Sequence, residues 1–266
     1  MGQFQLFQDP EYHEWVRQWG KPVLAAIYRQ DPVEGKLRLD EAQAALEECT
    51  LPEEQLEALT LSLTWFEYNL RRIGADADIS EQCYLDTRAI LLTRQSTDGG
   101  ELQRRRLLLV LRCEGDADGI EPLGRAEVDE LLRPLTRADE DHMLWHALAL
   151  WAFLHGDGEI MRRAYAAQLT NPSATMGQAK WQRVHLMHRL LEGSATREDV
   201  HAAIRSQQVR PQLLEFLNHI WPRCRAAGLD DEDLRAMLAI KAKEIDAARP
   251  PVPQPERRTK TTRTPP

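Results

Sequence analysis

The chain contains 266 residues, with 34 Lys and Arg against 42 Asp and Glu, which gives a formal charge of −8. Hydrophobic residues make up 42% and charged residues 29%, a composition typical of a folded, soluble protein rather than a disordered one. No segment approaches the roughly 20 apolar residues of a membrane helix, and residues 1–6 lack the cationic and apolar regions of a signal peptide. We therefore expect a soluble, cytoplasmic protein without a membrane partner.

Charge and cysteine content exclude further classes. No C-x-x-C pair occurs, which disfavours zinc knuckles and disulfide frameworks and predicts reduced thiols, mostly in the core. These cysteines are Cys49, Cys83, Cys113 and Cys224. The last 17 residues carry four basic groups and one acidic group, so the rest of the chain has a formal charge of −11 and should repel nucleic acid. We expect no nucleic-acid partner except through this basic tail. Arg outnumbers Lys by 28 to 6, as is common in proteins from GC-rich bacterial genomes, so we expect a bacterial protein.

The first predicted element is an amphipathic helix over residues 12–29, which should be broken or kinked near Gly20 and Pro22. We interpret residues 1–34 as an N-terminal capping region. Beyond it, glycines recur every 35–41 residues, each at the end of an apolar stretch, where a residue without Cβ can end a helix in the left-handed conformation. They are Gly35, Gly74, Gly115, Gly156, Gly193 and Gly228. The stretches before the last five cover residues 61–73, 107–114, 144–155, 184–192 and 213–221.

A second amphipathic segment follows each glycine, with acidic residues in its first turn where they can cap a helix. These segments cover residues 39–46, 79–92, 126–132, 159–169, 197–204 and 230–238. A proline then tends to close the segment, because proline interrupts a helix interior. The closing prolines are Pro52, Pro134, Pro172, Pro211 and Pro250. The pattern predicts a unit of helix, glycine turn, helix and proline break, although the same spacing could arise by accident around an irregular helical bundle.

This layout resembles the tetratricopeptide repeat and its longer Sel1-like relatives, most closely over residues 148–172, and HEAT-like helix pairs of similar length are a competing assignment. The family's Trp and Leu-Gly have no consistent counterpart here, and Met161 stands where its alanine is expected. The resemblance implies an all-α protein, an α-solenoid of about five to six antiparallel helix pairs that binds a protein or peptide. We assign residues 35–248 to this repeat domain and residues 249–266 to a disordered, Pro-rich basic tail.

Two patterns suggest metal binding. Residues 116–127 place acids at positions 1, 3 and 12 of a calcium loop, but Ile120 and Glu121 occupy its positions 5 and 6, which favours helix capping instead. The Asp-Gly pattern is also loosely similar to TerB-like helical domains. Histidines form two pairs at helical spacing, and the pairs could meet across stacked repeats. These pairs are His142 with His146 and His185 with His188. They support the alternative function, a helical-bundle metal-binding protein or metalloenzyme.

Motifs of nucleophilic or nucleotide chemistry do not occur, since there is no G-x-S-x-G, P-loop or G-x-G-x-x-G sequence. We therefore predict a non-enzymatic scaffold or adaptor without a cofactor, which binds a partner segment along the groove of the helical repeat. Aromatic and arginine side chains would anchor that partner, the arginines by gripping an acidic peptide. The candidates are Arg105, Trp145, Arg162, Trp181 and Arg183.

Overall fold

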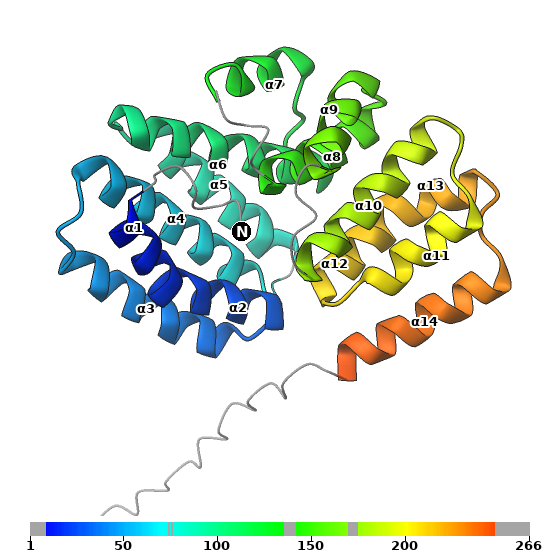
Figure 1. Ribbon diagram of the computed structural model, residues 1–266, viewed down its shortest axis with the longest axis horizontal. Coiled ribbons are helices and arrows are strands. Elements are labelled where there is room, and N and C mark those ends of the chain that lie inside the picture. The colour runs from blue at the N-terminus through cyan, green and yellow to red at the C-terminus, as the bar shows by residue number, and fades with distance from the viewer. Residues whose placement is uncertain (1–8, 74, 76, 136–141, 170–174, 248–266) are drawn as a thin grey trace, which may run out of the picture.

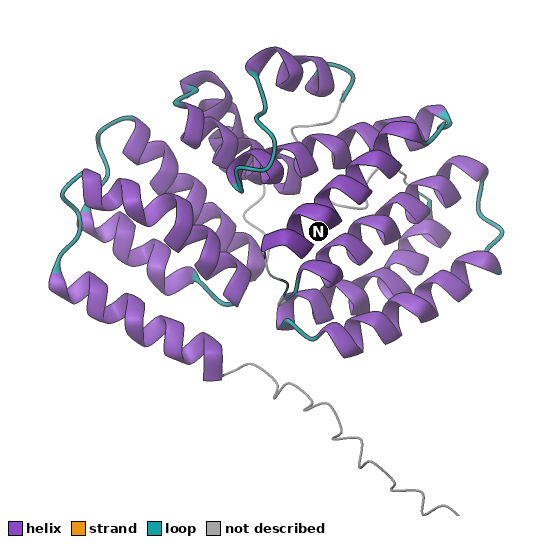
Figure 2. Ribbon diagram, turned by 180° about the vertical axis from the view of Figure 1, so that it is seen from behind, coloured by secondary structure: helices purple, strands orange, loops and turns teal. Residues whose placement is uncertain are grey.

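The structure of the chain is a computed structural model that describes residues 9–73, 75, 77–135, 142–169 and 175–247. Every regular element in these ranges is a helix, and no strand occurs among them (Figure 2). None of the described helices has both the length and the apolar content needed to cross a membrane. The predicted all-α class is confirmed, and the basic tail at 249–266 lies outside the described residues.

The elements, in chain order, are α1 (Pro10–Trp15), η2 (Val16–Gly20), α2 (Lys21–Arg29), α3 (Pro32–Glu47), α4 (Glu53–Arg72), α5 (Ala77–Thr93), α6 (Asp98–Ala117), α7 (Arg125–Leu132), α8 (His142–His155), α9 (Gly158–Leu169), α10 (Thr175–Leu191), α11 (Arg197–Ser206), α12 (Arg210–Glu215), η4 (Phe216–Ile220), α13 (Trp221–Ala226) and α14 (Glu232–Ala247). The elements η2 and η4 are π-helical turns, and each joins the α-helical segments on either side of it. The chain is therefore helical through both Gly20 and Pro22. At the position of the predicted break the helix is interrupted only by a π-helical turn, which ends at Gly20 directly before Lys21.

Polar side chains cap α9 and α11 where the sequence predicts helix starts, and Asp157 accepts a hydrogen bond from the Ile160 amide at 2.9 Å. The start predicted at residue 39 is wrong, because α3 begins at Pro32, where Asp31 accepts a hydrogen bond from the Glu34 amide at 3.0 Å. Thr196 forms a full capping box at the start of α11. Each bond satisfies an amide that has no partner within its own helix.

Three of the six recurring glycines end helices as predicted. Gly156, Gly193 and Gly228 have φ of +69°, +66° and +73°, in the left-handed region where glycine has no Cβ penalty. The prediction is wrong for Gly35 and Gly115, which lie inside α3 and α6. Their role is close packing, since a Cβ at Gly35 would overlap the Leu70 side chain and one at Gly115 would overlap the Tyr84 ring. Gly74 lies outside the described residues.

The described prolines lie at different places relative to the helices. Pro134 directly follows the end of α7 as expected, whereas Pro52 is the residue before the start of α4 and Pro211 stands in the first turn of α12. Proline fits a first turn because its missing N–H has no intrahelical acceptor there. Pro172 and Pro250 lie outside the described residues.

Helices contact both their neighbours in the chain and the helix two further along. The contacts α3 with α4, α4 with α5, α8 with α9 and α10 with α11 join neighbours, while α4 with α6, α6 with α8 and α8 with α10 join alternate helices. Figure 1 shows the result as an arc, with α1–α5 on one side, α10–α14 on the other and α6–α9 between them.

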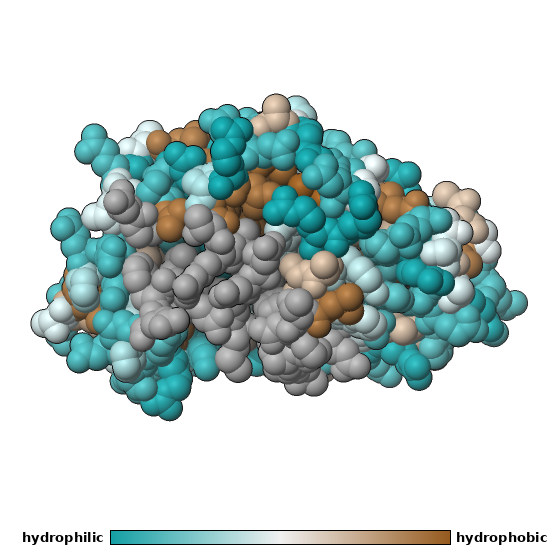
Figure 3. Space-filling model, turned by 45° about the horizontal axis from the view of Figure 1, so that its top comes forward, coloured by the Kyte–Doolittle hydropathy of each residue, from teal (hydrophilic) through white to brown (hydrophobic). Residues whose placement is uncertain are grey.

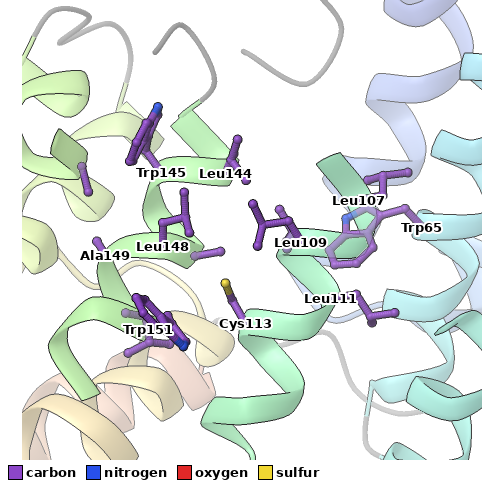
Figure 4. Close-up of a cluster of buried hydrophobic side chains, with 14 of the residues drawn as sticks. Trp65, Leu107, Leu109, Leu111, Cys113, Leu144, Trp145, Leu148, Ala149 and Trp151 are labelled. Carbon is purple, nitrogen blue, oxygen red and sulfur yellow. The ribbon is translucent and has the colours of Figure 1, made fainter. Parts of the chain in front are cut away.

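The core runs continuously through the alternate helices. Every residue from Leu144 to Phe153 of α8 and from Leu107 to Cys113 of α6 is buried. Figure 4 shows leucines of α6 between Trp65 of α4 and the side chains of α8. Three of the four cysteines are buried and all four are free, as expected of core thiols.

Polar contacts between alternate helices recur at a sequence distance close to the glycine period. Examples separated by 41, 42 and 39 residues are Gln103 Nε2 to Ser62 Oγ at 3.0 Å, Arg72 Nη1 to Glu114 Oε2 at 2.9 Å, and His155 Nε2 to Asp116 Oδ2 at 2.7 Å. Asp116 also accepts a hydrogen bond from the Leu123 amide at 2.9 Å. Both oxygens of this carboxylate, the first in the calcium-loop pattern, therefore have protein partners.

Candidate functional site

Two predicted site residues, His146 and Arg183, meet in a buried ionic cluster with Gln207 and Glu215, where α8, α10 and α12 come together. The Glu215 carboxylate lies 2.9 Å from Arg183 Nε and 3.1 Å from His146 Nε2. Arg183 also donates from Nη1 to the Gln207 side-chain oxygen at 3.0 Å. The side chain of Arg183 is only 2% exposed, so these contacts replace water around its charge.

The electrostatics of this cluster follow from its burial. Burial by itself raises the pKa of Glu215, but the adjacent Arg183 and His146 outweigh it and hold that pKa well below its ordinary range. Burial lowers the pKa of His146 despite the neighbouring carboxylate. A carboxylate only accepts hydrogen bonds, so the proton of a neutral His146 is assigned to Nε2. The cluster thus joins α10 to α12 through one charge pair, and α8 to α12 through the hydrogen bond of His146.

A second group, the aromatic–histidine cluster, lies on α9, α10 and α11. It consists of Tyr165, Trp181, His185, His188 and Asp199. Tyr165 stacks on His188 with ring centroids 4.4 Å apart, and Trp181 stacks on His185 at 5.1 Å. The Tyr165 hydroxyl lies 3.0 Å from His185 Nδ1, and His185 Nε2 lies 3.2 Å from Asp199 Oδ1. These rings are partly exposed, whereas His146, Arg183 and Gln207 of the ionic cluster are buried.

The capping box of α11 fixes the carboxylate of this cluster. Asp199 Oδ2 accepts hydrogen bonds from the Thr196 amide at 2.8 Å and the Thr196 hydroxyl at 2.9 Å. Burial raises the pKa of Asp199, but these bonds and His185 together lower it below its ordinary value. Asp199 is therefore ionised at neutral pH and positioned by backbone as well as side-chain bonds.

A hollow of about 650 Å³ opens between α6 and α7. Both helices supply an acid and a base to its lining, which also includes two apolar residues. The lining residues are Glu101, Leu102, Arg105, Glu130, Arg133 and Pro134. Arg105 lies against Glu101, and its side chain is 35% exposed. The hollow can thus offer charged and apolar contacts to the same ligand.

The predicted partner anchors fall into two groups. Arg105 and Trp181 are partly exposed and Arg162 is exposed, so all three reach the surface. The prediction is wrong for Trp145 and Arg183, which are 0% and 1% exposed. Trp145 packs in the core around α8 (Figure 4), and Arg183 is enclosed by its own ion pair, so neither has surface to offer a partner.

The histidine pairs do not assemble into a metal centre in the part of the chain that is described. No group of three or more His, Cys, Asp or Glu there could hold a metal ion. His146 donates from Nε2 to Glu215, whereas His185 and His188 belong to the aromatic–histidine cluster. The His142 side chain lies outside the described residues.

Sequence reasoning missed Tyr165, Asp199, Gln207 and Glu215. Only Asp199 carries a local signal, the Thr196-x-x-Asp199 capping pattern at the start of a helix. Glu215 lies 69 residues from His146, and no pattern in the sequence connects them.

The described part of the surface is mixed in polarity. On the face shown in Figure 3, hydrophilic side chains surround smaller hydrophobic areas. A comparison with protein families, curated proteins and solved structures finds no significant match to this chain.

Proposed function

We propose that this chain is an array of stacked helix pairs, similar to a degenerate tetratricopeptide solenoid, that works as a non-enzymatic scaffold for a partner protein. Two observations support the array: alternate helices contact one another from α4 to α10, and polar contacts between them recur at about 40 residues. In a solenoid each unit contacts its neighbours in just this succession.

The partner surface in this proposal is the hollow between α6 and α7, because its lining offers a ligand both charged and apolar side chains. Residues 107–113 of α6 and 144–153 of α8 are all buried, which leaves these segments unavailable for groove binding. The hollow presents Glu130 and Arg133 on one wall and Arg105 on the other. It fits an extended peptide segment in which charged side chains flank an apolar one.

We place the scaffold in a bacterial cytoplasm. The free thiols Cys49, Cys83, Cys113 and Cys224 support this placement, since thiols persist in reducing compartments.

Photo-crosslinking tests the proposal. A photoreactive amino acid is introduced at Leu102 in the hollow, with Val33 on the exposed face of α3 as the matched control position. In lysate of the source organism we expect one crosslinked protein from the Leu102 position, lost when excess unmodified protein is added and when Arg105→Glu is combined with Arg133→Glu. Equal crosslinking from both positions, or a product that survives competition, would refute the scaffold surface.

A further inference from the structure

The hydrogen bonds around His185 define one protonation pattern. Asp199 is ionised and only accepts, so His185 Nε2 carries the ring proton and donates it across 3.2 Å. In the neutral ring Nδ1 is then an acceptor, and the Tyr165 hydroxyl donates to it across 3.0 Å. A nucleophile bonded to a base, with that base oriented by a third group, is the arrangement that activates side-chain oxygens for covalent chemistry.

Packing holds the three groups in this order. Asp199 is fixed by the Thr196 capping box, His185 is stacked on Trp181, and Tyr165 is stacked on His188. The groups come from three different helices, so their alignment does not follow from local sequence spacing alone. Because the Tyr165 ring is partly exposed, a reagent can approach it from solvent.

We propose that Tyr165 is a covalent modification site that accepts a phosphoryl group from an activated phosphate ester. The phenol oxygen attacks phosphorus, forming an O–P bond while the bond from phosphorus to the leaving group breaks and that group departs with the electron pair. The phenol proton moves to His185 Nδ1. The resulting imidazolium is stabilised by the Asp199 carboxylate, and His185 later returns the proton to water.

One neighbouring side chain suits a phosphate donor. Arg162 precedes Tyr165 by three residues on the same helix face and is exposed, and its Nε donates to the Gly158 carbonyl at 3.0 Å while the rest of its guanidinium group faces solvent. Guanidinium groups bind phosphate oxygens well, so Arg162 can hold the phosphoryl oxygens of such a donor.

The test uses a dialkyl fluorophosphate as the probe on the full chain, because the tyrosine oxygen displaces fluoride from it by the same step. Modified peptides are quantified by mass spectrometry at several pH values. Tyr28 of α2, which is also partly exposed, serves as the internal control in every sample. A positioned base contributes roughly 10²–10⁴-fold to such steps, so we expect Tyr165 to react at least about 10-fold faster than Tyr28.

Two variants separate base assistance from mere exposure. His185→Phe keeps a ring against Trp181 but removes the base, and Asp199→Asn keeps a capping side chain but removes the charge. We expect both to slow Tyr165 to about the rate of Tyr28 and to give it the pH profile of Tyr28, with unchanged circular dichroism. Equal rates at the two tyrosines in the wild type, or an unchanged Tyr165 rate in both folded variants, would overturn the proposal.

Discussion

Removing one partner of the ion pair between Arg183 and Glu215 should destabilise the protein strongly, whereas removing both partners should not. Arg183→Met leaves Glu215 as a charge without its main partner, and Glu215→Leu does the same to Arg183. With side chains only 2% and 22% exposed, each single change should cost about 3–5 kcal/mol in the free energy of unfolding. The double variant removes both charges and fills the space with apolar groups, so it should lie within about 2 kcal/mol of the wild type.

Urea unfolding at pH 7, followed by circular dichroism, measures each term of this double-mutant cycle. The pair of Arg17 with Glu14 is the matched control, because these side chains are 66% and 53% exposed and solvent screens their attraction, so the same cycle should show little coupling between them. Additive single and double effects at Arg183 and Glu215, or single effects as small as those of the control pair, would refute the reasoning from burial.

Three further changes have defined outcomes in the same unfolding assay. Gly115→Ala should lower the free energy of unfolding by about 1–3 kcal/mol, because the new Cβ would lie 2.6 Å from Cζ of Tyr84. Gly158 has open space around it, so Gly158→Ala is the control and should change that free energy by no more than about 0.5 kcal/mol. Similar values for the two variants would contradict the packing argument. Thr196→Ala should cost about 1 kcal/mol through loss of the α11 cap, and no loss would show the cap to be dispensable. Burial lowers the pKa of His146, so below about pH 6.5 the unfolded chain binds a proton that the folded protein does not. The free energy of unfolding should therefore fall between pH 7 and pH 5, and it should fall by less in His146→Gln than in the wild type. The same pH dependence of stability in both proteins would contradict this assignment.

Local chemistry in the sequence determined the helices and many of their ends. Apolar periodicity placed α5, α7, α9 and α11 close to their observed bounds. Acidic residues in a first turn marked helix starts, and glycines such as Gly156 and Gly228 marked helix ends. Both signals could be identified in the sequence because capping and the left-handed conformation involve only a few neighbouring residues.

Tertiary structure decided which of these residues lie inside. Gly35 and Gly115 look like helix stops in the sequence, yet Leu70 and Tyr84 pack against them and keep them within helices. The sequence around Trp145 does not distinguish a core tryptophan from an exposed one, because its burial depends on the helices that surround α8.

Tertiary structure also determined which side chains contact one another in the candidate sites. Glu215 meets His146 from 69 residues away, and Tyr165, His185 and Asp199 arrive from three helices. The sequence specifies the conformation of each helix through contacts between near neighbours. The alignment of side chains across helices depends instead on how the apolar faces of distant segments are buried against one another.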